Sequence, residues 1–149
     1  GKILSGAYDE AANGIEVLRE EAEGATLKVI LETGALLSAE KIYHAALLAM
    51  AAGADFVKTS TGKIDISATP EAVVIMCQAI KAYFELTSRK VGIKVAGGVR
   101  TPEQAALYYT IVEQILGKEW LTTDLFRIGA SSAANNILSA IEGKEVKYF

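Results

Sequence analysis

Four short apolar runs recur along the chain, and each is followed by a stretch whose apolar residues repeat at helical spacing. Unbroken runs of this kind, rich in valine and isoleucine, are typical of parallel strands covered on both faces. They begin about 27 to 37 residues apart, which is the spacing of successive βα units. The predicted strands are residues 27–31, 54–57, 91–95 and 125–128.

The stretches around these runs predict amphipathic helices, the first of them ahead of the first strand. Thr-Pro-Glu at 69–71 and again at 101–103 predicts a helix start, because a hydroxyl caps the helix and proline suits its first position. Gly24, Gly53 and Gly117 stand where helices are expected to end. Three helical faces are predicted to be apolar: Ala11, Ile15, Leu18 and Ala22; Val73, Met76, Cys77, Ile80 and Phe84; and Tyr108, Ile111, Val112 and Ile115.

Two α/β architectures fit this order of elements, a small doubly wound sheet and half of a (β/α)8 TIM barrel. Because side chains alternate along a strand, Lys28, Lys58 and Lys94 are expected on one face of neighbouring strands. A doubly wound sheet would bury these ammonium groups under helices, whereas a barrel interior can gather them in one polar site with Glu32. A whole barrel needs about 250 residues, so we predict that residues 1–149 form a single domain with roughly half of its strand-helix units.

Lys58 follows an apolar run, at the carboxyl end of the second predicted strand. One chemistry that uses such a lysine is Schiff-base formation, in which the neutral amine is the nucleophile. The alternative is a lysine whose stem covers apolar surface while its charged end reaches solvent. Lys94 on the next strand favours the first interpretation, because two neighbouring ammonium groups repel each other and one loses its proton more easily. Lys28 has the same parity but lies at the amino end of its strand.

Glycine-rich turns follow the last three predicted strands. Glycine lets backbone N–H groups approach an anion closely, and a helix N-terminus attracts phosphate. Three such loops at one rim predict a phosphate site, although each alone could be a tight turn or a helix cap. The residues are Gly62, Lys63, Gly97, Gly98, Gly129, Ser131 and Ser132.

Composition narrows the function classes further. The formal charge of −3, with no basic tract, argues against nucleic acid as a partner. No apolar run approaches 18 residues and no leader is visible, so no membrane association is expected; with the single cysteine, Cys77, this predicts a cytoplasmic protein. Cys77 is expected in the core, His44 on a helix surface, and Trp120 in a loop or at the core edge. One histidine and one cysteine make a zinc site improbable.

Four ordered motifs, at residues 27–34, 54–62, 92–100 and 126–132, together resemble the successive strand motifs of the deoxyribose-phosphate aldolases. The resemblance spans essentially the whole chain. It implies a class I aldolase on a (β/α)8 barrel, which needs neither a metal nor another cofactor. Such an enzyme reversibly cleaves 2-deoxy-D-ribose 5-phosphate to acetaldehyde and D-glyceraldehyde 3-phosphate.

The resemblance also implies roles for individual residues. Lys58 would form the Schiff base and Lys94 would perturb it. Lys28, Glu32 and Thr61 are possible contacts to substrate hydroxyls or members of a proton network. The substrate phosphate would be held by Gly62, Lys63, Gly97, Gly98, Arg100, Gly129, Ser131 and Ser132.

The family pattern also contains parts that precede this sequence. One is a strand with an aspartate that shuttles protons beside the two lysines, expected immediately before Gly1. Tyr148 is only a loose counterpart of a C-terminal tyrosine found in some members. We therefore expect a C-terminal half whose partner is an N-terminal half of the same enzyme or a second copy of the chain, in a homo-oligomer. Two alternatives stay open: a Schiff-base aldolase for a related phosphosugar, and a noncatalytic half-barrel that binds phosphosugar or supports assembly.

Overall fold

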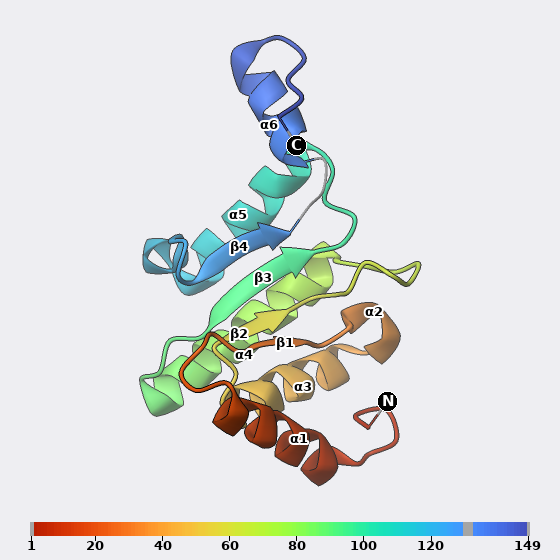
Figure 1. Ribbon diagram of the computed structural model, residues 1–149, viewed down its shortest axis with the longest axis vertical. Helices are drawn as coiled ribbons and strands as arrows, with labels where there is room; N and C mark the ends of the chain where they lie inside the picture. Colours follow the sequence, from red (N-terminus) through yellow and green to blue (C-terminus); the bar gives the residue numbers. More distant parts are fainter. Residues whose placement is uncertain (1, 130–132, 149) are drawn as a thin grey trace.

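The computed structural model describes residues 2–129 and 133–148, in which strands and helices alternate along the chain (Figure 1). The strands are β1 (Lys28–Ile30), β2 (Phe56–Lys58), β3 (Gly92–Ala96) and β4 (Phe126–Gly129). The helices are α1 (Tyr8–Glu21), α2 (Thr33–Leu36), α3 (Ala39–Ala51), α4 (Pro70–Thr87), α5 (Pro102–Leu116) and α6 (Ala133–Glu142), and a short 3-10 helix covers Lys118–Trp120. Each predicted strand is present, with bounds shifted by one or two residues.

The four strands form one parallel sheet in the order β1-β2-β3-β4 (Figure 1). Right-handed crossovers between strands that follow one another in space as in sequence place all connecting helices on the same face. A doubly wound sheet would instead reverse its strand order and carry helices on both faces. The sheet therefore has the arrangement of consecutive barrel strands, as predicted.

The face under the helices holds the apolar core. Val57, Ile93 and Val95 are fully buried there, together with Met50 of α3 and Met76 of α4. Cys77 belongs to the same cluster, and burial raises the pKa of its thiol to about 12. The thiol therefore stays protonated at neutral pH, which agrees with the expected packing role.

The predicted helix starts at Thr69 and Thr101 are confirmed. The Thr69 hydroxyl accepts a hydrogen bond from Ala72 N, and Thr101 forms a reciprocal capping box with Gln104. Gly53 and Gly117 follow α3 and α5 with φ of 99° and 92°, a backbone conformation that favours glycine. His44 lies exposed on α3, as expected.

The placement of Trp120 at a loop or the core edge was wrong. Its side chain is only 2% exposed, and its Nε1–H donates to Val91 O at 3.0 Å. The ring packs edge-on against Phe84, with centroids 5.2 Å apart. The segment after α5 is short and polar, but it folds into a 3-10 helix that places the indole in the core. Periodicity over so few residues could not indicate this.

The predicted apolar face of α1 is also only partly correct. Ile15 packs against the core, but Leu18 is 59% exposed and no residue of α1 is fully buried. The helix is held near the core by polar contacts. Arg19 in the last turn of α1 pairs with Asp55 at 2.6 Å, which anchors this end of the helix at the amino end of the strands.

Asp55 is the centre of a polar cluster at this amino end. Its carboxylate accepts hydrogen bonds from Leu27 N at 2.8 Å, from Arg19 and from Arg89 at 3.1 Å. Burial acts to raise the pKa of Asp55, but these three donors outweigh it and hold the pKa below its ordinary value. Arg89 also donates to the carbonyls of Met50, Gly53 and Ala54, so the cluster ties α3 to the strands.

Across the described ranges, no helix combines the length and apolar character needed to cross a lipid bilayer.

Candidate active site

Lys58 and Lys94 are direct neighbours on adjacent strands. They are register partners across β2 and β3, and both side chains are half-buried. Because Val57, Ile93 and Val95 point into the core, alternation directs the two lysines to the opposite, helix-free face. Both line an open cavity of about 650 Å³ at the carboxyl end of the sheet.

Most of the predicted phosphate residues line this same cavity. The described lining includes Thr61, Gly62, Gly97, Gly98, Arg100 and Gly129. Gly62, Gly97 and Gly98 have φ of 78°, 88° and 79°, so the turns at this rim need glycine. The fold thus gathers an amine pair and glycine turns around one cavity, and their roles remain predictions.

Other predicted residues lie elsewhere. Lys63 is exposed and is outside the described cavity lining; its backbone N–H donates to the Thr61 hydroxyl at 3.2 Å. Ser131 and Ser132 fall outside the described residues. Tyr148 is exposed at the end of the chain, where its backbone N–H donates to Asn135.

Lys28 lies on the lysine face but one pleat nearer the amino end, opposite Phe56. Its Nζ is 5.2 Å from the centre of the Phe56 ring. Burial, followed by the charges of Lys94, Arg127 and Lys58, lowers the pKa of Lys28. Lys28 therefore belongs to the electrostatic surroundings of the lysine pair, although it is outside the described cavity lining.

Arg127 is a further cation on this face that sequence reasoning missed. It is the register partner of Lys94 on β4, and its guanidinium lies 4.8 Å from the centre of the Phe56 ring. Its parity within the fourth motif was a usable signal, since Arg127 and Gly129 must share a face. No residue of the four strands is acidic, so the strands themselves supply no counter-charge to these cations.

Two glycines make room on the lysine face. A Cβ on Gly129 would lie 2.7 Å from Lys94 Cε, and a Cβ on Gly92 would lie 2.4 Å from the Phe56 ring. Both distances are too short for real atoms, so Lys94 and Phe56 occupy space that any other residue would fill. Gly129 therefore contributes to the position of the Lys94 ammonium.

Glu32 is not among the described residues that line the cavity. Its carboxylate binds Thr61 instead. Its carboxylate accepts hydrogen bonds from Thr61 N at 3.1 and 3.3 Å and from the Thr61 hydroxyl. Thr59 and Ser60, both fully buried, hold the same segment to β3 by donating their hydroxyls to Ala96 O. The end of β2 is thus fixed to both neighbouring strands.

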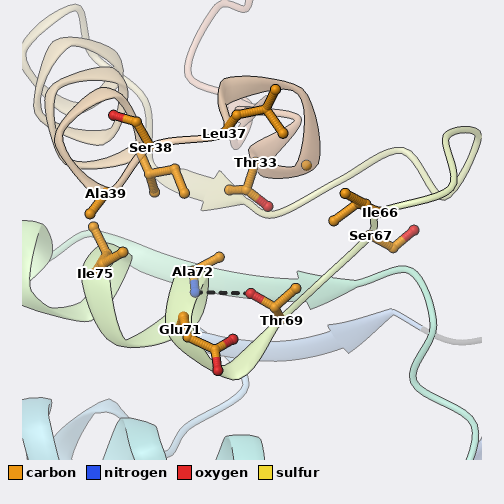
Figure 2. A pocket seen from close by; sticks show the side chains of 12 residues that line it. Thr33, Leu37, Ser38, Ala39, Ile66, Ser67, Thr69, Glu71, Ala72 and Ile75 are labelled. Atoms are coloured by element: carbon orange, nitrogen blue, oxygen red, sulfur yellow. Dashed lines mark hydrogen bonds between the residues drawn. The ribbon is translucent and has the colours of Figure 1, made fainter.

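A smaller pocket of about 280 Å³ lies on the helix side of the sheet, and Figure 2 shows it. Thr33, Leu37 and Ser38 lie on one side, the start of α4 on the other, and Ile66 and Ser67 at one end. The Thr33 hydroxyl is buried without a hydrogen-bond partner among the described residues. Neither Lys58 nor Lys94 lines this pocket, so it is separate from the amine pair.

Comparison with known proteins places this geometry in a family. Residues 4–136 match the DeoC/LacD family aldolase domain. The chain is 44% identical over 135 residues to the deoxyribose-phosphate aldolase of Mus musculus, covering 91% of this chain and 42% of that protein. It is 42% identical over 145 residues to the enzyme of the same name from Agrobacterium fabrum, covering 97% and 54%.

The fold agrees with solved structures. An apo-form crystal structure from Toxoplasma gondii, provisionally assigned as a deoxyribose-phosphate aldolase, matches with a TM-score of 0.81 at 25% identity, over 93% of this chain and 53% of that one. The chain thus spans about half the length of the relatives it matches. Because the matched domain covers residues 4–136, with the lysine pair and its glycine turns inside it, the chain belongs to the DeoC/LacD family of aldolases.

Proposed function

We propose that this chain is the lysine-bearing half of a class I deoxyribose-phosphate aldolase. The observation that carries the proposal is the register pairing of Lys58 with Lys94 at the edge of a cavity rimmed by Gly62, Gly97 and Gly98. An amine nucleophile needs a second group that favours its neutral form, and a neighbouring ammonium does this by repulsion. Relatives named deoxyribose-phosphate aldolase support the choice of substrate.

In the proposed reaction the neutral amine of Lys58 attacks the aldehyde carbon of open-chain 2-deoxy-D-ribose 5-phosphate. Loss of water leaves an iminium, which accepts electrons when the bond between C2 and C3 breaks. A base takes the proton of the C3 hydroxyl, and glyceraldehyde 3-phosphate leaves. The remaining enamine takes a proton at C2, and water then releases acetaldehyde and the free lysine.

The surrounding residues have supporting roles in this proposal. Lys94 lies beside the nucleophile and moves protons together with water. Gly62, Gly97, Gly98 and Arg100 bind the phosphate, and binding there fixes the aldehyde near Lys58. Lys63, Gly129, Ser131 and Ser132 are proposed for the same phosphate site.

The lysine face also indicates what must cover it. The strands expose four cationic side chains and carry no acid, and the chain spans about half of its relatives. We propose that an N-terminal half supplies the remaining barrel strands and an aspartate that balances Lys58 and Lys94. A second copy of the chain is the other candidate for that surface. Residues 1–149 would act as one domain of this assembly, in a cytoplasmic homo-oligomer with a role in deoxyribonucleotide and carbohydrate catabolism.

Turnover of 2-deoxy-D-ribose 5-phosphate tests this function. We expect slow cleavage by the chain alone and faster cleavage once the N-terminal half is added. Lys58→Arg should abolish it in both cases, because a guanidinium stays protonated and cannot form an imine. Lys41→Arg, on the exposed surface of α3, is the matched control and should leave the rate unchanged.

Three outcomes would contradict the proposal. Retention of about a tenth of the wild-type rate or more by Lys58→Arg would remove Lys58 as the nucleophile. Preference for another phosphosugar in a substrate panel would indicate a related Schiff-base aldolase. Complete inactivity with every phosphosugar, with and without the N-terminal half, would indicate a noncatalytic half-barrel.

A further inference from the structure

Glu32 is hydrogen-bonded to the start of the β2–α4 loop, which comprises residues 59–69. Its two carboxylate oxygens accept the Thr61 N–H, and one also accepts the Thr61 hydroxyl. The Thr61 oxygen in turn accepts the Lys63 N–H at 3.2 Å. Because the acceptor is a carboxylate, the hydrogen bonds from Thr61 to Glu32 are charge-assisted. Gly62 lies between Thr61 and Lys63, the two residues that this chain of hydrogen bonds joins.

The backbone conformation of Glu32 restricts where its side chain can lie. Glu32 has φ of 54° and ψ of 59°, a left-handed conformation that few residues other than glycine adopt. The residues on both sides are tied to the strand next to them: Leu31 N donates to Lys58 O and Thr33 N to Thr59 O, each at 2.9 Å. Because both neighbours of Glu32 are hydrogen-bonded, its left-handed backbone conformation is fixed at this rim.

The far end of the loop is fixed by contacts too close for a side chain. A Cβ on Gly34 would lie 1.9 Å from Ile66 O, and one on Gly97 would lie 2.7 Å from Ser67 Cβ. Ile66 and Ser67 sit beside the Thr33 pocket in Figure 2, and Ala68 N donates to Gly97 O at 3.3 Å. The end of the loop is therefore held in place by Gly34 and Gly97, as its start is held by Glu32.

We infer that Glu32 is a positioning residue for sugar-phosphate binding: its carboxylate holds Thr61 and Gly62 at the cavity rim and carries no proton in the reaction. This inference rests on the proposed function. Both oxygens of Glu32 already accept hydrogen bonds from Thr61, and the described cavity lining includes Thr61 and Gly62 but not Glu32. Glu32 therefore acts through the loop.

The test compares Glu32→Ala with Glu32→Gln in the full chain. Glutamine can still accept the Thr61 N–H and donate to the Thr61 oxygen, so it preserves the position without the charge. The matched control is Glu23→Ala, an exposed glutamate that is also left-handed, with φ of 45°. If Glu32→Ala does not fold, Glu32→Asn replaces it, because asparagine tolerates left-handed φ and is too short to reach Thr61 as Glu32 does.

The first measurement is amide hydrogen exchange of Thr61 and Lys63 by NMR. We expect exchange roughly tenfold faster in Glu32→Ala and close to wild type in Glu32→Gln and Glu23→Ala. The second is turnover, in the form in which the wild type is active. For 2-deoxy-D-ribose 5-phosphate, Glu32→Ala should raise KM about tenfold while kcat changes less than about threefold. Glu32→Gln should restore both.

Each contrary result has a definite meaning. Unchanged exchange at Thr61 in Glu32→Ala would overturn the inference. An equal loss of kcat in Glu32→Gln and Glu32→Ala would also overturn it, because it would make Glu32 a proton carrier. Exchange needs no catalysis, so a wild type that never cleaves the sugar phosphate would defeat the proposed function while exchange still decides whether Glu32 positions the loop.

Discussion

Lys94 reaches the cavity across Gly129, so the position of its side chain depends on the absence of a Cβ there. The distance of 2.7 Å from a Cβ on Gly129 to Lys94 Cε means that even a methyl group would displace the lysine side chain. The nearest obstructed atom lies near the flexible end of Lys94, so the ammonium moves, and Ala96 Cβ at 3.0 Å requires only a small shift of the backbone.

We predict that Gly129→Ala lowers kcat for 2-deoxy-D-ribose 5-phosphate about tenfold or more, because misplaced catalytic groups lose rate steeply. The midpoint of urea unfolding should change little. Steady-state kinetics and denaturation curves on the same preparation check this pair of outcomes. An unchanged kcat in the folded variant would show that the position of the Lys94 ammonium is unimportant.

Sequence predicts the residues of this site where a strand fixes their direction. Lys58 and Lys94 follow from parity alone, and Arg127 could have been found by the same rule. The contact between Glu32 and Thr61 could not be found in this way, because the left-handed backbone of Glu32 turns its side chain away from the direction that parity gives. The structure places the Glu32 carboxylate against Thr61, while a place for Glu32 in a proton network stays a prediction.

At the scale of the elements, helix α1 has no fully buried residue. Gly14 lies in its interior, and a Cβ there would meet nothing within 4 Å. Glycine inside a helix costs stability because the unfolded chain gains conformational freedom from it. A substitution at Gly14 therefore measures the contribution of helix propensity to stability.

We predict that Gly14→Ala stabilises the chain by about 0.5–1 kcal/mol in urea denaturation. Gly24→Ala is the matched control. A Cβ on Gly24 also meets nothing within 4 Å, but its φ of 85° disfavours alanine, so this change should destabilise. No gain from Gly14→Ala would mean that α1 is frayed before the rest of the chain unfolds.

The Asp55 cluster links α1 and α3 to the strands and makes stability depend on pH. Because the pKa of Asp55 is lower folded than unfolded, its contribution is present above the ordinary value of 3.8 and is lost as pH falls through the folded value. We predict that Asp55→Asn lowers the free energy of unfolding at neutral pH. The difference from wild type should shrink as pH falls below about 4.

Denaturation curves from pH 7 to pH 3 measure this difference, with Asp124→Asn at an exposed position as the control. A difference that stays constant across the range would show that the carboxylate charge is not what stabilises the cluster.

Sequence patterns predict the order of the elements better than their ends. The caps at Thr69 and Thr101 are local, so two helix starts could be read directly. Residues 54 and 55 read as strand, but β2 begins at Phe56. Asp55 lies just ahead of it, where its backbone N–H donates to Leu27 O and its carboxylate accepts the Leu27 N–H. Helix α2 and the 3-10 helix before β4 depend on tertiary packing and could not be read from periodicity over three or four residues.

At the scale of the whole molecule, the chain has one face packed by helices and one face that carries Lys28, Lys58, Lys94 and Arg127. The half-barrel interpretation follows from these cations, since a sheet covered on both faces would bury them without partners. The arrangement of the strands in a single consecutive order agrees with it. No residue of these strands identifies what covers the face, so the sequence could not predict it.

Reductive trapping with acetaldehyde and borohydride tests the central claim most directly. Acetaldehyde forms an imine with the reactive amine, and reduction fixes it as an ethyl group of about 28 Da that peptide mass mapping can locate. We predict one ethyl group per chain, on Lys58, and none in Lys58→Arg, because a guanidinium cannot form the imine. Labelling spread over exposed lysines such as Lys41, with no preference for Lys58, would contradict it.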